Sequence, residues 1–205
     1  MKTSNTSLLS IAFLLCWIGQ LSAQVTMTQS SFPRAAGFTD SLIITANTLD
    51  YYPEPLRNEI DEINAMVYPA INNGVYRAGF ATSQQAYEKA YAELFAALDS
   101  LEERLSSRRY LLGDVITEAD WRLFTTLVRF DMVYHLHFKC NRRRIIDYPN
   151  LWAYTRELYQ WEGVAETVNF EHIVRHYHYS HETINPNRII PINPVLDWHE
   201  PHGRG

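Results

Sequence analysis

The stretch "ATSQQAYEKAYAELFAALDSLEERL" (residues 81–105) carries the clearest helical pattern in the chain. Thr82 and Gln85 have the spacing of a capping box, in which two side chains satisfy the free amides at the start of a helix. Apolar residues then recur every three or four positions against a Glu, Lys and Arg face, at Tyr87, Tyr91, Leu94, Leu98, Leu101 and Leu105. Such a stripe predicts an amphipathic helix that packs along one face.

The flanking segments predict further helices. Before this stretch, Leu56, Ile60, Ile63 and Val67 recur at helical spacing, and Asn-Asn-Gly at 72–74 is a stop signal. After it, Thr117 and Asp120 form a second capping box. The helix that follows is apolar on more than one side, which predicts a place at the centre of a bundle.

Two more helices are predicted, one from Pro149 and one over roughly 164–178. No segment alternates like a strand. The sequence therefore predicts an all-α domain over residues 51–182, built as a bundle of about five or six helices that begins near residue 52.

The two ends of the chain predict different things. Residues 1–23 combine Lys2, the apolar run 8–19 and a small-residue end at Ala23, which is the order of a secretory signal peptide. The apolar run is too short for a stable membrane span. The alternative is a frayed apolar helix. Residues 24–50 are predicted to be a linker, of which residues 24–48 are mobile.

The C-terminal segment 183–205 is rich in proline, which rules out a continuous helix. It retains seven large apolar residues, namely Ile184, Ile189, Ile190, Ile192, Val195, Leu196 and Trp198. Burying about half of them would hold the segment against the bundle. We therefore predict an extended tail that packs on the helices.

Composition excludes one class of partner. The net charge is −5, and the only basic run is Arg142-Arg143-Arg144. A weakly acidic chain with so short a basic run lacks the electrostatic footprint of a nucleic-acid-binding protein. A run of this kind is typical of a solvated helix end.

The histidines and the thiol of "RFDMVYHLHFKC" (129–140) offer little chemistry by themselves. His135 and His137 are two residues apart, so a helix points them to different faces, and His172 and His176 share a face without an acidic companion. No metal site is therefore expected. Cys140 follows the C-terminal end of a helix, where the dipole disfavours a thiolate, and we expect a structural thiol.

The tyrosines are the better candidates. Tyr76, Tyr134 and Tyr177 each end an aromatic or histidine-rich segment, on three different predicted elements. If these ends converge, their hydroxyls are donors that can stabilise a thiolate or protonate a leaving group. The alternative is that each is a core tyrosine whose hydroxyl bonds locally.

Long runs of the chain resemble one known family. They are "NNGVYRAGFATSQQAYEKA" (72–90), "YLLGDVITEADWRLFTTLVRFDMVYHLHFKCNRRRIIDYPNL" (110–151), "VAETVNFEHIVRHYHYSH" (164–181), "TINP" (183–186) and "DWHEPHG" (197–203). Over about residues 50–205 the chain looks like the C-terminal helical domain of the glutathionyl-hydroquinone reductases, the Xi class of glutathione transferases.

The resemblance implies an activity and roles for the tyrosines. In that family a thioredoxin-like domain binds glutathione, and the cysteine of its Cys-Pro-Trp motif attacks the sulfur of a glutathionyl-hydroquinone. The hydroquinone leaves, and a second glutathione resolves the mixed disulfide. By resemblance, Tyr76 is a proton donor or acceptor, and Tyr134 and Tyr177 help to hold the cysteine as a thiolate.

The resemblance also implies glutathione as co-substrate, an aromatic hydroquinone as substrate, a homodimer and a cytoplasmic location. The chain departs from the family in lacking Cys-Pro-Trp, and residues 24–50 are too few for a thioredoxin-like domain. We therefore expect it to supply the hydrophobic-substrate half of the site and to be inactive alone, which leaves its status as an enzyme open. The alternative is a non-catalytic dimerisation or interaction module from a truncated or rearranged gene, and the leader favours export.

Overall fold

The computed structural model describes residues 50–205. The predicted leader and almost all of the predicted linker fall outside these residues. The export that the leader implies therefore stays a prediction. Residues 50–56, which carry the short 3-10 turn η1 (Glu54–Leu56), group with the N-terminal part of the chain, and Arg57–Gly205 form a unit of their own. Within the described range, no helix has the length and apolar character to cross a membrane.

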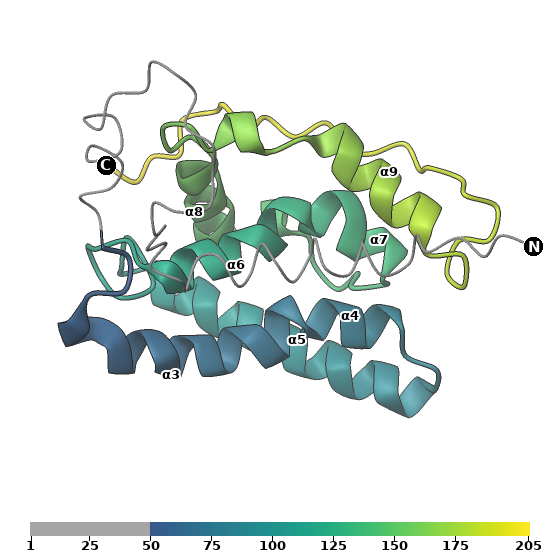
Figure 1. Ribbon diagram of the computed structural model, residues 1–205, viewed down its shortest axis with the longest axis horizontal. Helices are drawn as coiled ribbons and strands as arrows, with labels where there is room; N and C mark the ends of the chain where they lie inside the picture. Colours follow the sequence, from purple (N-terminus) through teal and green to yellow (C-terminus); the bar gives the residue numbers. More distant parts are fainter. Residues whose placement is uncertain (1–49) are drawn as a thin grey trace, which may run out of the picture. The chain divides into compact units, whose positions relative to one another are not determined.

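The unit from Arg57 onward is helical, as predicted (Figure 1). Its longer helices are α3 (Arg57–Val67), α4 (Gly74–Gly79), α5 (Gln84–Leu105), α6 (Glu118–Arg129), α8 (Pro149–Tyr159) and α9 (Phe170–Ser180). Shorter turns join them: η2 (Tyr68–Asn72), η3 (Phe130–Tyr134), α7 (His135–His137), η4 (Ile145–Asp147) and η5 (Ala165–Thr167). Between residues 50 and 205 the only β feature is a single bridge from Tyr110 to Gly113.

The start of α5 corrects one prediction. The N-cap is Ser83, whose Oγ accepts a hydrogen bond from the Ala86 amide at 3.2 Å, so the capping box assigned to Thr82 and Gln85 is wrong. Both hydroxyl residues can cap, and Ser83 has the extended backbone that is typical of an N-cap residue. The predicted stripe is buried from Leu94 to Leu105.

Helix α6 begins with the predicted capping box and is buried on several sides. The Asp120 carboxylate accepts hydrogen bonds from the Thr117 amide at 2.8 Å, the Leu111 amide at 2.9 Å and the Tyr154 hydroxyl at 2.8 Å. This one side chain therefore ties the preceding loop and α8 to the start of α6.

Glu157 lies on α8 and is buried, as Asp120 is. It accepts hydrogen bonds from Arg109 at 2.7 Å, the Tyr110 hydroxyl at 2.9 Å and Arg204 of the tail at 2.9 Å. We call Asp120, Glu157 and their partners the acidic cluster.

Two π-helical turns interrupt the helical periodicity. The turn η2 contains Pro69 and separates α3 from α4. The prediction that Asn-Asn-Gly ends the helical segment is therefore wrong, because these residues lead into a new helix. The turn η3 continues α6 as far as Tyr134. Each π turn accommodates an extra residue and so rotates the side chains that follow it about the helix axis.

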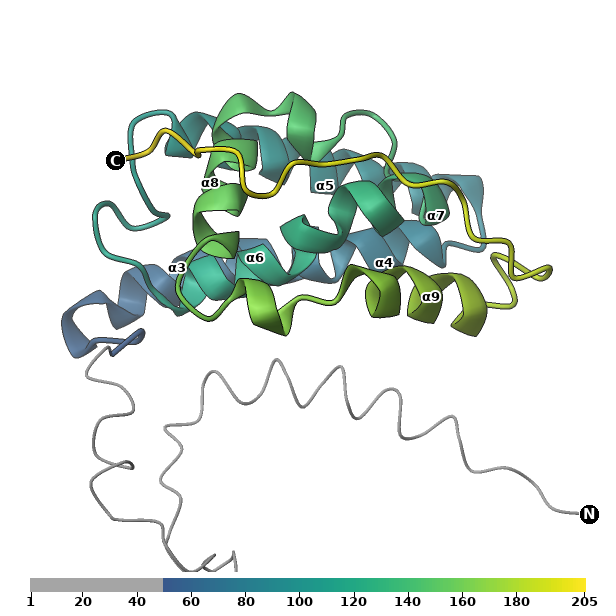
Figure 2. The same cartoon turned by 90° about the horizontal axis from the view of Figure 1, so that it is seen from above.

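The tail runs back along the bundle from the end of α9 to the side of α8 (Figures 1 and 2). Trp198 is buried, with its ring centroid 5.0 Å from that of Trp152 and 5.1 Å from that of Phe170. Of the tail's seven large apolar residues only Trp198 is buried, and Ile192 and Val195 are fully exposed, so fewer than half of them contribute burial. Prolines alternate with these residues, and no helix or strand period turns their side chains to one face.

Candidate functional site

The hydroxyls of Tyr76, Tyr134 and Tyr177 meet at one point. Tyr76 comes from α4, Tyr134 from the end of η3 and Tyr177 from α9. The Tyr177 hydroxyl oxygen lies 2.5 Å from that of Tyr76 and 2.8 Å from that of Tyr134, and the Tyr76 and Tyr134 oxygens are 3.5 Å apart. The structure thus brings together all three tyrosines singled out in the sequence, and we call them the tyrosine cluster.

The π turns contribute to this convergence. Tyr134 is the last residue of η3, and Tyr76 lies in the first turn after η2. Asp131, buried within η3, accepts hydrogen bonds from the amides of Ile145 at 2.6 Å and Ile146 at 3.0 Å, which fixes η3 against the start of η4. The local distortion at Tyr134 is therefore held by long-range contacts.

The cluster is buried unevenly. Tyr134 and Tyr177 are buried, whereas Tyr76 is half-buried and connects the cluster to the surface. Phe80, one turn further along the chain, is exposed, and its ring packs 5.3 Å from that of Phe138. Tyr76 is therefore the most exposed member of the cluster.

Burial also fixes the protonation state of the inner tyrosines. Desolvation, together with the neighbouring phenols, raises the pKa of Tyr134 well above its ordinary value. Desolvation and then Tyr76 raise the pKa of Tyr177 in the same direction. Both side chains are therefore neutral phenols at pH 7, able to donate a hydrogen bond or a proton but unsuited to attack sulfur.

The histidines beside the cluster are held by hydrogen bonds, one of which joins two of them. His137 Nε2 lies 3.0 Å from His181 Nδ1, and His178 donates from Nδ1 to the Val174 carbonyl at 2.9 Å. Burial, followed by His178, His181 and Lys139, lowers the pKa of His137 to about 4, so this side chain is neutral at pH 7. Residues 50–205 contain no group of three His, Cys, Asp or Glu side chains able to hold a metal ion.

Cys140 is placed as a structural thiol. It is fully buried, and its amide donates a hydrogen bond to the Tyr134 carbonyl at 3.1 Å. Burial raises the pKa of its thiol to about 12, which outweighs the opposite effect of Lys139. At pH 7 the thiolate is a negligible fraction of this side chain, so Cys140 supplies no nucleophile.

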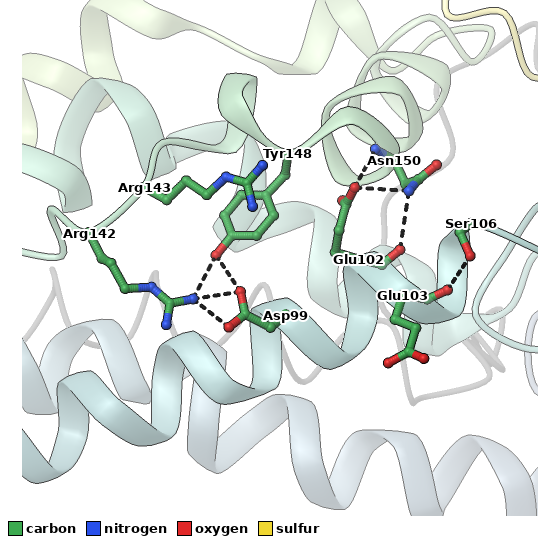
Figure 3. Close-up of a pocket in the computed structure, with 8 residues that line it drawn as sticks. All are labelled: Asp99, Glu102, Glu103, Ser106, Arg142, Arg143, Tyr148 and Asn150. Atoms are coloured by element: carbon green, nitrogen blue, oxygen red, sulfur yellow. Dashed lines mark hydrogen bonds and ion pairs between the residues drawn. The ribbon is translucent and has the colours of Figure 1, made fainter.

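No pattern in the sequence indicated the polar pocket of about 570 Å³ that lies between α5 and the start of α8, away from the tyrosine cluster (Figure 3). Arg142 donates to both carboxylate oxygens of Asp99 at 2.5 Å, and Glu102 accepts from the Asn150 amide at 2.9 Å. The first contact joins α5 to the connection before α8, and the second joins α5 to the first turn of α8. Two members of the basic run are engaged here, because Arg143 lies over the Tyr148 ring, 4.0 Å from its centroid.

Comparisons with known proteins point to the glutathione transferases. Residues 84–157 match the family model described as glutathione S-transferase, C-terminal domain. The chain is 58% identical over 155 residues to glutathionyl-hydroquinone reductase YqjG of Escherichia coli, covering 76% of this chain and 47% of that protein. It is also 58% identical over 146 residues to glutathionyl-hydroquinone reductase PcpF of Sphingobium chlorophenolicum, covering 71% of this chain and 47% of that protein.

Solved structures give the same result. The glutathione-bound structure of YqjG superimposes with a TM-score of 0.78 at 55% identity, covering 81% of this chain and 54% of that one. A Xi-class transferase from Natrialba magadii gives a TM-score of 0.76 at 52% identity, covering 78% of this chain and 49% of that one. The chain spans about half the length of the curated relatives that it matches.

Proposed function

Because the chain carries a glutathione S-transferase C-terminal domain and resembles the glutathionyl-hydroquinone reductases, we propose that it supplies the aromatic-substrate half of such a reductase site. The observation that carries the proposal is the meeting of the Tyr76, Tyr134 and Tyr177 hydroxyls. In this proposal Tyr76 contacts the substrate, and the two buried tyrosines, Tyr134 and Tyr177, form hydrogen bonds with one another and with the Tyr76 hydroxyl.

The chemistry needs a proton donor of this kind. When a thiolate attacks the sulfur of a glutathionyl-hydroquinone, a disulfide forms, the carbon–sulfur bond breaks, and its electron pair passes to the ring carbon. That carbon must gain a proton. Tyr76 is suited to provide it, because Tyr177 is bonded to its hydroxyl and can share the charge that develops on the phenol oxygen.

The same chemistry needs a thiolate that these residues do not offer. Cys140 is buried and has a raised pKa, and the 205-residue sequence has no Cys-Pro-Trp motif. In this proposal the attacking cysteine and most of the glutathione-binding surface belong to a thioredoxin-like domain. Glutathione is then a co-substrate that enters the tyrosine-lined site only through its bond to the hydroquinone.

A chimera tests this division of labour. The N-terminal half of YqjG is fused in front of residue 50, and turnover of a glutathionyl-hydroquinone by glutathione is measured for the chimera and for the chain alone. We expect turnover from the chimera, a loss of about a hundredfold or more in Tyr76→Phe, and no turnover above the uncatalysed exchange from the chain alone. A folded chimera without activity, or an active chain alone, would contradict the proposal.

A second candidate is an interaction module, favoured by apolar surface away from the tyrosines. A groove of about 450 Å³ between η2 and α5 is lined mainly by small and apolar residues: Met66, Pro69, Ala70, Ala96 and Ala97. Sedimentation of the chain distinguishes the two candidates. A stable homodimer that forms whether or not Tyr76 is replaced, with no binding of hydroquinone, would favour the interaction module.

A further inference from the structure

One contact between α4 and the residue after α7 is unusually close. Gly79 ends α4, and Phe138 follows α7 and is fully buried. A Cβ added at Gly79 would lie 2.3 Å from two ring carbons of Phe138 and 2.8 Å from its Cβ. Since Phe138 has no free space around it, only glycine allows α4 and this ring to pack at their present distance.

Phe138 in turn contacts every member of the tyrosine cluster. Its ring centroid lies 5.3 Å from that of Tyr76, 5.5 Å from that of Tyr134 and 5.9 Å from that of Tyr177. It is stacked on Tyr134 and meets the other two rings edge to face. No other described ring is paired with all three tyrosines, so the position of Phe138 is shared by the whole cluster.

We propose that Gly79 and Phe138 are positioning residues that set the spacing of the three tyrosine hydroxyls. Gly79 allows Phe138 to pack close to α4, and Phe138 in turn holds the positions of the three tyrosine rings that carry the hydroxyls. Neither residue offers a group that reacts. The importance of this spacing for substrate rests on the proposed function, whereas the spacing itself can be measured without turnover.

Helix α4 offers a matched control. Gly74 begins the same helix and is also buried, but a Cβ there would meet its nearest neighbours, the Pro69 carbonyl at 3.6 Å and Leu94 at 3.9 Å, at ordinary contact distance. Gly74→Ala and Gly79→Ala therefore make the same chemical change in one helix, and the clash with Phe138 belongs to only one of them.

The experiment labels tyrosine with carbon-13 at Cζ in the full chain and assigns the cluster resonances with Tyr→Phe variants. We expect Gly79→Ala to shift all three cluster resonances and to weaken binding of hydroquinone, used as the probe, by about tenfold or more. Gly74→Ala should leave both unchanged. Cluster resonances that stay in place in Gly79→Ala, or that move as much in Gly74→Ala, would overturn the proposal.

A second substitution covers the case in which Gly79→Ala fails to fold. Phe138→Leu removes the ring but keeps an apolar side chain, and it should shift the same three resonances. In the double variant Gly79→Ala/Phe138→Leu, the smaller side chain leaves room for the added methyl. We expect this variant to melt at a higher temperature than Gly79→Ala alone, or to fold where Gly79→Ala alone does not. Unshifted resonances in Phe138→Leu would overturn the proposal.

The resonances also separate this proposal from the proposed function. An inactive chimera with resonances that respond to Gly79→Ala would refute the function and keep the positioning role. An active chimera whose cluster resonances do not shift in Gly79→Ala or Phe138→Leu would support the function and refute the positioning role.

Discussion

The tyrosine cluster and the acidic cluster both bury tyrosine hydroxyls, but they give those hydroxyls different partners. Tyr154 donates to Asp120, and Tyr110 donates to Glu157, so each phenol proton there is held by a carboxylate. The hydroxyls of Tyr76, Tyr134 and Tyr177 have only one another among the residues described.

On the proposed function, this difference separates a structural network from a substrate site. A phenol that donates to a buried carboxylate is not free to donate to a ligand, because a buried carboxylate without a hydrogen-bond partner would destabilise the fold. Three phenols bonded in a ring satisfy no charge, and Tyr76 can turn its proton outward while Tyr177 keeps a partner in Tyr134. The predictions that follow test this distinction, beginning with the largest expected effect.

Asp120→Ala should be one of the most destabilising changes. It leaves the Thr117 and Leu111 amides and the Tyr154 hydroxyl without their acceptor in a buried place. We expect the free energy of unfolding to fall by about 3–5 kcal/mol, measured by urea denaturation. Asp147→Ala, at an exposed carboxylate paired with Arg144, is the control and should cost less than about 1 kcal/mol. Equal losses would remove the basis of the comparison.

Acid should act on the histidines beside the tyrosine cluster. Burial lowers the pKa of His137 from 6.5 to about 4, so below pH 6.5 the unfolded chain binds a proton that the folded chain refuses. The free energy of unfolding should therefore fall between pH 6.5 and about 4, by at most about 3.4 kcal/mol.

His137→Gln should flatten this dependence, and His172→Gln, at an exposed position of α9, should not. Asp120 has the opposite effect on the free energy of unfolding, which it raises as the pH falls. Burial raises its pKa, so the folded chain takes up that proton before the unfolded chain does. An unchanged slope in His137→Gln would contradict the account of this histidine.

Replacing a single hydroxyl in each cluster compares the two directly. Tyr154→Phe removes a donor to a buried carboxylate and should cost about 1–3 kcal/mol of stability. Tyr177→Phe removes only bonds between neutral phenols and should cost about 1 kcal/mol. Urea titrations in which Tyr177→Phe is the more destabilised variant would show that the tyrosine cluster is itself a structural network.

The tail joins the two regions, and its middle should contribute least. It leaves α9 beside His181 and ends where Arg204 binds Glu157, but Ile192 between them is fully exposed. Ile192→Ser should therefore change the free energy of unfolding by less than about 0.5 kcal/mol. Trp198→Ala, at the buried end of the tail, is the comparison and should cost about 3–5 kcal/mol.

The sequence predicted what depends on neighbouring residues. The capping box of Thr117 and Asp120 is a local pattern, and so is the stripe of α5, because both follow from the helical period. Ser83 was missed since two adjacent hydroxyl residues give the same signal. The π turns η2 and η3 were missed because each inserts a residue into a pattern read at constant spacing.

The site could be predicted only in part. The tyrosines were selected by their place at the ends of aromatic segments and by the family resemblance, but their meeting spans 101 residues between Tyr76 and Tyr177. Phe138 and Gly79 gave no signal, because their contact also joins distant parts of the chain. Which phenols find a carboxylate and which find each other is decided by packing, not by local sequence.

The most direct test of the central claim is binding of hydroquinone to the unmodified chain, measured by isothermal titration calorimetry. The account predicts binding that weakens by about tenfold in both Tyr76→Phe and Tyr177→Phe, a loss of about 1.4 kcal/mol each. Tyr154→Phe should bind as the wild type does, although it is the less stable protein. Binding that survives both cluster substitutions, or that is lost equally in Tyr154→Phe, would contradict the claim that the tyrosine cluster is the substrate site.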